Sequence, residues 1–463
     1  MLPPRIVSLR WLAGSPRMKL TLIQPKIGHS ADNMYREKAV MEPLVLAIVA
    51  ALTPLDIEVV LIDDRIEPVP FDTPTDLVAL TVTTFTAKRA YEISDEYRRR
   101  GVQVIMGGYH PSNMPEEAKT HSDCVYIGDA EDLWPEVIAD ARTRNLKPYY
   151  RAKVGILQKE IIPRRDIYDN KNYLPITLMQ FGRGCRFDCN FCSVSTFYNK
   201  MSFHRPVADV IKEIEKQDRS LILFVDDNIV MDHARASELF RALIPLNIKW
   251  FSQGDINMAN NREFMELMVR SGCKGHLIGF ESVEEESLKS MRKNHNLSRP
   301  GLYEEQLKVL RDYGLLIWAT FTIGHEHDNK DIFERTLEFS MRHRFALVDF
   351  NVLMPYPNTP LYHQLASEKR LLFDGTWWLH PDFRFGKAVF TPHNMTTEEL
   401  AEGCYSARQE YFSMTSIVKR AFDLKTNLRS LFNTRMYMML NYLSYNDGLK
   451  KQDILLGGAP DLS

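Results

Sequence analysis

Short apolar runs alternate with amphipathic stretches along the first part of the chain. The apolar runs have the length of buried strands and cover residues 19–24, 57–61, 77–82, 102–106 and 124–127. Between them, residues 41–52, 87–100 and 134–144 have the length and spacing of helices. This alternation is typical of a doubly wound parallel sheet. We therefore predict an α/β domain over residues 18–146.

Small and polar residues gather where these predicted strands end. They are Thr83, Thr84, Gly107, Gly108, His110, Gly128, Asp129 and Glu131. Ligands of doubly wound sheets bind at the carboxyl ends of the strands, so this edge is the predicted ligand site of the domain. The stretch has no Gly-x-Gly-x-x-Gly turn, which makes a dinucleotide a poor candidate for that ligand.

The alternation returns after a polar connector at residues 147–173. The predicted strands cover residues 174–179, 221–225, 249–253, 275–280, 315–323 and 345–352. Six β/α units predict a barrel over residues 174–365, with its chemistry at the carboxyl ends of the strands. The side chains that follow those strands are Asp226, Asp227, Gln253, Glu281, His325, His327 and Tyr356. Residues 366–463 are predicted to form a mainly helical, aromatic cap.

Three cysteines lie close together just after the first of these strands. Cys185, Cys189 and Cys192 occupy positions i, i+4 and i+7, and no further cysteine follows within the next 80 residues. Thiolates bind iron, zinc or Cu(I), but a closed site normally needs a fourth ligand. Three thiolates on a [4Fe–4S] cluster would leave one iron open for a substrate or cofactor. The alternative is a zinc knuckle, although structural zinc sites usually pair their cysteines as two dyads.

The spacing Cys-x3-Cys-x2-Cys, with Phe191 before the last cysteine, resembles the radical S-adenosylmethionine (radical SAM) superfamily. The resemblance implies a partial six-unit barrel and a [4Fe–4S] cluster on Cys185, Cys189 and Cys192. It also implies that the open iron chelates SAM, which an electron from the cluster cleaves to a 5′-deoxyadenosyl radical. A flavodoxin or ferredoxin is the expected electron donor.

The same resemblance assigns roles to residues at the strand ends. Phe191 is expected near the SAM adenine, and Asp226 with Asp227 takes the place of the family's Gly-Gly-Glu stretch, which holds the methionine amino group. Glu281 is expected at the ribose hydroxyls, and Gln253 is a candidate polar contact to SAM. The alternative for several of these polar residues is that they cap the following helices.

The first domain resembles the cobalamin-binding domain found ahead of some radical SAM barrels. Its strand-end residues listed above, from Thr83 to Glu131, are then the expected cobalamin contacts. The Asp-x-His-x-x-Gly motif of families that ligate cobalt through histidine is absent, which implies base-off cobalamin. His110 is either a contact or an ordinary paired histidine, and the domain could also be degenerate. Residues 357–362, Pro-Asn-Thr-Pro-Leu-Tyr, resemble the Pro-Gly-Thr-Pro-Leu-Tyr stretch at the end of such barrels.

The family resemblance implies methylation of an unactivated carbon, with methylcobalamin as the donor and a second SAM to remethylate the cobalt. Ring formation, rearrangement and oxidation by the same cofactors are the alternatives, and so is a regulatory protein without catalysis. His325 and His327 are spaced as on a loop or strand, so we expect them, with Tyr356, to contact substrate instead of a second metal.

Composition and charge limit the partners. The formal charge of −2 does not indicate nucleic-acid binding, and a small or lipid-like substrate fits better. Six cysteines without a disulfide pattern, and no apolar run long enough to span a bilayer, predict a cytoplasmic protein. Five basic residues stand against one acid over residues 411–435. That segment is predicted to be either a helix packed on the barrel or a membrane-surface helix.

Overall fold

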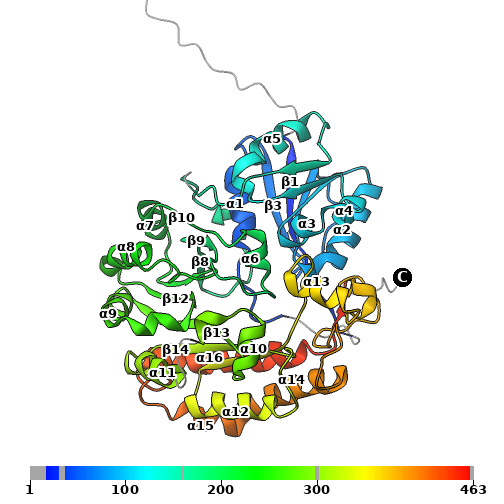
Figure 1. Cartoon of the computed structure of the whole chain (residues 1–463). Coiled ribbons are helices and arrows are strands. Elements are labelled where there is room, and N and C mark those ends of the chain that lie inside the picture. Colours follow the sequence, from blue (N-terminus) through cyan, green and yellow to red (C-terminus); the bar gives the residue numbers. More distant parts are fainter. Residues whose placement is uncertain (1–16, 31–36, 158–159, 298–301, 459–463) are drawn as a thin grey trace, which may run out of the picture.

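The first lobe of the molecule is built on a six-stranded parallel sheet (Figure 1). The computed structural model describes residues 17–30, 37–157, 160–297 and 302–458. The strands are β1 (Lys19–Gln24), β3 (Glu58–Asp63), β4 (Leu77–Thr81), β5 (Gln103–Gly107), β6 (Cys124–Ile127) and β7 (Tyr149–Arg151), in the order β3-β1-β4-β5-β6-β7. The edge strand β7 lies within residues 147–173, which the sequence predicts as a connector.

Helices cover both faces of this sheet. Helices α1 (Leu44–Leu52) and α5 (Ala130–Arg142) pack on the face that carries Leu20 and Leu22, whereas α2 (Ala87–Arg99) packs on the face of Ile23. The short helices α3 (Tyr109–Asn113) and α4 (Pro115–Thr120) lie between β5 and β6. The predicted doubly wound α/β fold is therefore confirmed.

The second lobe holds a second parallel sheet, in the order β15-β14-β13-β12-β11-β8. Its strands are β8 (Thr177–Met179), β11 (Leu221–Phe224), β12 (Lys249–Gly254), β13 (Cys273–Glu281), β14 (Leu316–Ile323) and β15 (Leu347–Val352). Strands β8 and β15 are its two edges, so the barrel is partial, as predicted. The helices around it are α7 (Val207–Glu215), α8 (His233–Leu243), α9 (Arg262–Arg270), α10 (Glu285–Ser290), α11 (Leu302–Asp312) and α12 (Ile332–His343).

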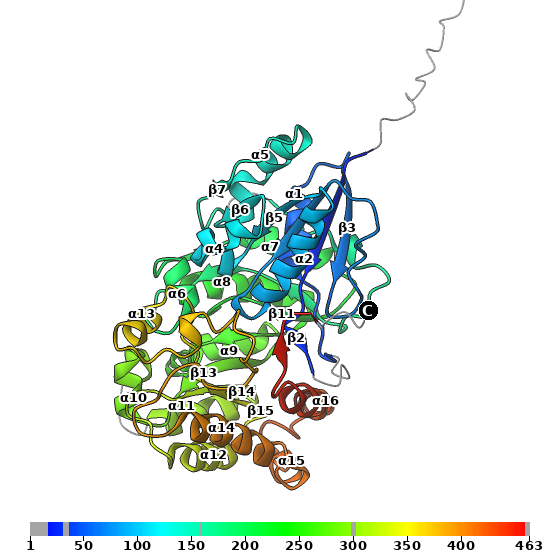
Figure 2. The same cartoon turned by 90° about the vertical axis from the view of Figure 1, so that its right-hand side faces the viewer.

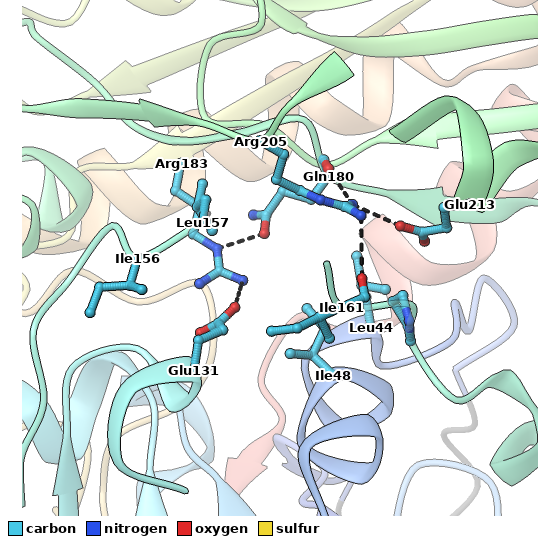
Figure 3. A pocket seen from close by; sticks show the side chains of 11 residues that line it. Leu44, Ile48, Glu131, Ile156, Leu157, Ile161, Gln180, Arg183, Arg205 and Glu213 are labelled. Atoms are coloured by element: carbon cyan, nitrogen blue, oxygen red, sulfur yellow. Dashed lines mark hydrogen bonds and ion pairs between the residues drawn. The ribbon is translucent and has the colours of Figure 1, made fainter. Parts of the chain in front are cut away.

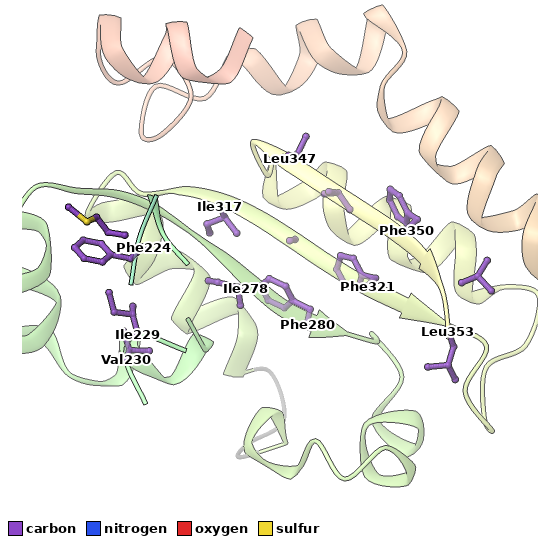
Figure 4. Packing of buried hydrophobic residues seen from close by; sticks show 14 of the residues in the cluster. Phe224, Ile229, Val230, Ile278, Phe280, Ile317, Phe321, Leu347, Phe350 and Leu353 are labelled. Carbon is purple, nitrogen blue, oxygen red and sulfur yellow. The ribbon is translucent and has the colours of Figure 1, made fainter. Parts of the chain in front are cut away.

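Aromatic side chains from neighbouring strands form the core between this sheet and its helices (Figure 4). The ring centroids of Phe280 and Phe321 are 5.7 Å apart, and those of Phe321 and Phe350 are 6.2 Å apart. Phe339 of α12 packs edge-to-face with Phe280, and their ring centroids are 6.0 Å apart. Because these rings alternate with lumen-facing residues along each strand, they fix the register that brings the strand ends together.

Two short antiparallel pairs complete the sheets. Strand β9 (Gly182–Gly184) pairs with β10 (Ser202–His204), and the segment between them carries the three cysteines and α6 (Ser193–Phe197). Strand β2 (Gly28–His29) pairs with β16 (Leu455–Leu456), which joins the two ends of the described chain (Figure 2). A Cβ atom on Gly28 would lie 1.8 Å from the Leu455 carbonyl oxygen, so only glycine fits there.

The C-terminal region is mainly helical, with α13 (Pro360–Ser367), α14 (Thr397–Tyr411), α15 (Met414–Ala421) and α16 (Leu431–Lys450). Met436 and Tyr437 of α16 pack against Leu316 and Ala346 of the barrel. The C-terminal helix therefore packs on the barrel, as one of the two predicted alternatives has it. No helix in the described part of the chain is long and apolar enough to cross a bilayer.

Arg420 holds the last two helices to the barrel. Its side chain is fully buried, and Nη1 donates to the carbonyl oxygens of Phe345 (3.0 Å) and Ala346 (3.3 Å). Nη2 donates to the carbonyl oxygen of Tyr411 (2.9 Å) and to Oδ1 of Asn441 (3.0 Å). One guanidinium thus satisfies acceptors from the barrel, α14 and α16.

Replacing this side chain should destabilise the protein strongly. We expect Arg420→Met to lower the free energy of unfolding by about 3 kcal/mol or more, because several buried acceptors lose their donors. Urea unfolding followed by circular dichroism would measure the loss. The neighbouring exposed residue supplies the control, since Lys419→Met should change the unfolding midpoint little. Equal midpoints for the two variants would contradict this role for Arg420.

Candidate active site

The cysteine loop, residues 185–192, is positioned by two carboxylates at the end of β11. Asp226 accepts hydrogen bonds from the backbone N–H groups of Phe181 (2.8 Å) and Gly182 (2.6 Å). Asp227 accepts one from the N–H of Gly184 (2.7 Å), which directly precedes Cys185. The predicted SAM residues Asp226 and Asp227 therefore contact the backbone ahead of the loop, and their contact with SAM stays a prediction.

Burial governs the charge of these groups. It raises the pKa of Asp226 to about 8, against the two backbone hydrogen bonds, and it raises the pKa of Asp227 as well. Burial also raises the thiol pKa of Cys185 to about 12 and that of Cys189 to about 11. Cysteine thiols ionise when a metal binds them, so three cysteines on one loop fit an iron–sulfur cluster.

The loop is also fixed from the side of the barrel exit. The N–H of Asn190 donates to the carbonyl oxygen of Met291 (3.1 Å), and the N–H of Leu361 donates to that of Asn190 (2.9 Å). Leu361 belongs to the Pro-Asn-Thr-Pro-Leu-Tyr stretch, in which Asn358 adopts a φ of 66°. Asparagine tolerates this conformation, so it can stand where glycine stands in the resembled stretch.

A chain of polar contacts runs from Glu281 to His325 beside the cysteine loop. The carboxylate of Glu281 accepts from Nζ of Lys293 (2.6 Å) and from Oγ1 of Thr322 (3.2 Å), whose hydroxyl is 3.3 Å from Nε2 of His325. The His325 and Phe191 rings are 5.9 Å apart. Burial lowers the pKa of His325. The structure thus brings together the predicted residues Phe191, Glu281 and His325.

The backbone of Glu281 is strained. Its φ is +67°, at a register shift between β13 and β14. A Cβ atom on Gly279 would lie 2.2 Å from Oε1 of Glu281, so a glycine is needed for this carboxylate to fold back over the strand. Non-glycine residues with positive φ are costly and concentrate at functional sites. The strain therefore supports a functional role for Glu281.

The remaining predicted barrel residues occupy different surroundings. Gln253 is exposed at the end of β12, and His327 is exposed on the loop that follows the buried His325. Tyr356 packs against Phe85 of the first lobe, with ring centroids 6.2 Å apart, and burial together with Cys192 raises its pKa to about 12. Tyr356 therefore lies between the cysteine loop and the first lobe.

A cavity of about 380 Å³ lies between the two lobes. Six of the predicted cobalamin residues line it: Thr83, Gly107, Gly108, Gly128, Asp129 and Glu131. Gly108 and Gly128 have φ values of 109° and 102°, and Cβ atoms there would lie 2.7 and 2.5 Å from backbone oxygens. Only glycine allows this close backbone cradle. A wall of backbone and small side chains around a deep cavity fits a bulky cofactor.

His110 and Thr84 do not line this cavity. His110 is fully buried, and its Nε2 is 3.0 Å from the Glu117 carboxylate and 3.1 Å from the Tyr91 hydroxyl. Its Nδ1 is 3.4 Å from the hydroxyl of Thr84. Trp378 also donates to Glu117, at 3.0 Å. The Trp378 contact ties the first lobe to the C-terminal region. The His110 side chain points to these partners and does not reach the cavity.

Other lining residues did not emerge from the sequence pattern. They are residues of the sheet and helices of the first lobe, and groups from the barrel: Val45, Ile48, Ala79, Ile105, Trp134, Tyr109, Arg183, Phe197, Tyr198 and Val225. Helix α1, Leu-Val-Leu-Ala-Ile-Val-Ala-Ala-Leu, is apolar on all sides, and that was the available signal. Glu131 lies in the first turn of α5, which begins at Ala130, four residues before the predicted start.

Arg183 connects the cysteine side of the barrel to the cavity wall (Figure 3). Its Nη2 donates to Oε1 of Glu131 (2.6 Å), and its Nη1 is 3.4 Å from Asp129. The hydroxyl of Tyr198 also donates to Asp129, at 3.2 Å. Arg183 lies two residues before Cys185. Its contacts with Glu131 and Asp129 therefore hold the cysteine loop next to the cavity.

Comparisons with known proteins agree with this arrangement. Residues 179–340 match the model of the radical SAM superfamily, and residues 38–138 match the B12 binding domain. The chain is 30% identical to the bacteriochlorophyllide d C-12(1)-methyltransferase of Chlorobaculum tepidum, over 87% of this chain and 89% of that one. It is 25% identical to the hopanoid C-2 methylase of Rhodopseudomonas palustris, over 77% and 70%.

Two solved structures share the fold. The radical SAM methyltransferase TsrM from Kitasatospora setae, with cobalamin and a [4Fe–4S] cluster bound, superposes with a TM-score of 0.62 at 16% identity, over 76% of this chain and 75% of that one. The cobalamin-dependent radical SAM enzyme OxsB gives a TM-score of 0.65 at 15% identity, over 92% and 72%.

Fold, site and relatives together define an enzyme that combines a radical SAM barrel with a cobalamin domain. The chain belongs to the cobalamin-binding radical SAM family. A [4Fe–4S] cluster, SAM and cobalamin are its cofactors, and the predictions of family, enzyme class and cofactors are confirmed.

Filling the cavity should block cobalamin without affecting the cluster. Val45 lines the cavity and is 45% exposed, so Val45→Trp adds volume there without disturbing the core. We expect cobalamin binding to weaken at least about tenfold in an absorbance titration, because an indole occupies the space that the cofactor needs. Leu55→Trp, at a position of the same lobe that is 87% exposed, is the control. Unchanged cobalamin binding by Val45→Trp would rule out this cavity.

The anchor of the cysteine loop can be tested at Asp226. Asp226→Asn sets an amide NH₂ against a backbone N–H, and an unmet buried donor costs about 1–3 kcal/mol. We expect at least about half of the iron to be lost on gel filtration after reconstitution. Asp218→Asn, at an exposed position, should retain its iron. Equal iron contents would show that the loop does not depend on Asp226.

Proposed function

We propose that the enzyme methylates an unactivated carbon of a large, mainly apolar small molecule. The observation that carries the proposal is that residues next to the cysteine loop also line the cavity between the lobes. Arg183, Tyr198 and Val225 line this cavity, and Asp226, which holds the cysteine loop, follows Val225 directly. When bound, the cluster with SAM supplies a hydrogen-abstracting radical, and cobalamin supplies the methyl group.

Aromatic side chains that meet where the first lobe, the barrel and the C-terminal region join favour an apolar substrate. The ring centroid of Phe85 lies 6.2 Å from that of Tyr356, 5.0 Å from that of Trp377 and 5.3 Å from that of Phe385. These residues come from the first lobe, the barrel exit and the C-terminal region, so substrate at this point would touch all three. Bulky aromatic surfaces suit flat or polycyclic molecules. The named relatives act on a bacteriochlorophyllide and on hopanoids, which supports this class.

A second cavity, of about 770 Å³, has Phe385 in its wall. Apolar residues such as Ile66 and Ile454 line it together with charged residues of both signs: Lys26, Lys38, Arg65, Lys451, Glu37, Asp64 and Glu67. This volume lies in the range of small-molecule sites. We infer that substrate reaches the cysteine loop from this side, past Phe385.

We also propose base-off cobalamin, because His110 is held by Glu117 and Tyr91. A reduced flavodoxin or ferredoxin is the proposed electron donor. The proposed location is the cytoplasm, because the six cysteines are free and a radical SAM cluster needs a reducing environment.

The first test of the function is product formation by the reconstituted enzyme. With iron, sulfide, hydroxocobalamin, SAM and a reductant, we expect 5′-deoxyadenosine and S-adenosylhomocysteine together. Cys189→Ala should lower 5′-deoxyadenosine at least about a hundredfold, since the cluster loses a ligand. Cys404→Ala, which removes a buried thiol outside the loop, is the matched control. Unchanged nucleoside formation by Cys189→Ala would contradict the cluster assignment.

The substrate class needs a separate measurement. We expect label from methyl-labelled SAM in a tetrapyrrole carboxylate or a polycyclic terpenoid, detected by mass spectrometry. Hydrophilic metabolites such as free amino acids serve as the comparison set. Label in that set alone would overturn the apolar substrate, even if 5′-deoxyadenosine forms normally.

A further inference from the structure

Large apolar side chains are exposed on α15 and on the segment that follows it. Met414 is 74% exposed, Val418 49% and Phe422 67%. Spacing by four residues places them on one side of the helix. Leu424 (77%) and Leu431 (67%) continue the surface to the start of α16. We call these five residues the apolar stripe.

The stripe is unusual on this protein. In the described part of the chain, eight of the eleven large apolar or aromatic side chains that are exposed lie between residues 414 and 445. The other three, Val45, Leu55 and Met201, are scattered. A concentration of exposed apolar side chains marks a surface that contacts a partner or a membrane.

The stripe is a fixed feature and does not belong to a loose helix. Ser416 and Arg420, on the opposite side of α15, are buried, and both bond to the carbonyl oxygen of Tyr411, at 2.6 and 2.9 Å. Asn441 of α16 accepts from the same Arg420. The helix is therefore held with Met414, Val418 and Phe422 toward solvent.

The exposed charges within residues 414–445 are all basic, and one of them, Lys425, pairs with the exposed Asp312 of α11 at 2.5 Å. Between residues 414 and 445 the exposed charged side chains are Lys419, Lys425, Arg429 and Arg435. The single acid of this range, Asp423, is buried and pairs with Arg311 at 2.9 Å. On α16, Arg435 lies four residues after Leu431, and Met438 lies three residues after Arg435. Basic and apolar side chains therefore share one face of this helix.

We propose that the apolar stripe docks on the surface of an anionic lipid bilayer. Its apolar side chains enter the boundary between headgroups and acyl chains, while Lys419 and Arg435 contact lipid phosphates. A second copy of the chain is the less suitable occupant, because pairing this face with itself brings basic side chains together. An anionic membrane complements them. Docking does not depend on the methyl-transfer reaction, so either proposal can fail alone.

Sedimentation of the full-length protein with lipid vesicles tests the proposal. We expect binding to phosphatidylcholine vesicles that contain about one third phosphatidylglycerol to exceed binding to pure phosphatidylcholine at least about tenfold, and to weaken with added salt. Equal binding to the two compositions, or none to either, would overturn the proposal.

Matched variants locate the surface. The triple variant Met414→Ser, Val418→Ser, Phe422→Ser should reduce binding at least about tenfold, because it removes the inserted side chains. Leu55→Ser removes an exposed leucine from the other lobe and should bind as the wild type does. Retained binding by the triple variant would place membrane contact elsewhere and overturn the assignment.

A charge-reversal pair keeps the test decisive if the triple variant folds poorly. Lys419→Glu with Arg435→Glu should reduce binding to the anionic vesicles at least about twenty-fivefold, from about fivefold for the loss of each basic residue. Lys216→Glu, at an exposed position of the barrel, is its control. Light scattering addresses the competing occupant. A wild-type dimer that the triple variant converts to a monomer, with no vesicle binding, would make this face an interface between copies and overturn the proposal.

Discussion

A buried guanidinium joins the first lobe to the start of the cysteine loop. Arg183 lies in β9, two residues before the first cysteine, and contacts Glu131 and Asp129 at the edge of the first sheet. Burial alone would lower the pKa of Arg183, but the two carboxylates raise it, so the cation persists inside the protein. A buried ion pair adds little net stability compared with apolar packing, yet its geometry is specific. Here it holds the cysteine loop next to the cofactor cavity.

The cysteine loop extends this logic into the barrel. Phe187 of the loop stacks on His295, with ring centroids 3.5 Å apart, and Phe191 packs against the core. Backbone hydrogen bonds fix the loop further. Asp226 and Asp227 fix the residues ahead of it, and Met291 and Leu361 fix Asn190 in its middle. These residues come from three separate elements, so the barrel must be folded before the loop is fully formed.

The sequence was sufficient wherever local pattern determines structure. The bounds of β1 and β6 agree with the prediction, because each is a short apolar run between clear turn residues. The start of α5 was placed four residues too late, and the helix contains Pro135 in its interior. Among the strand-end residues, glycines were informative because their backbone positions exclude side chains. His110 was not, because its partners Tyr91, Glu117 and Trp378 come from distant segments.

Residues 411–435 show why one sequence segment is compatible both with a helix packed on the barrel and with a membrane-surface helix. Lys419 and Arg420 are adjacent basic residues, yet Lys419 is exposed and Arg420 is fully buried. A helix turns by about 100° per residue, so neighbours face different environments. Residues 411–435 therefore pack on the barrel through one face and present apolar and basic groups to solvent through another. A count of charges along the sequence cannot separate these faces. Arg420 faces inward because the carbonyl oxygens of Phe345 and Tyr411 accept its hydrogen bonds, and these acceptors lie in other segments.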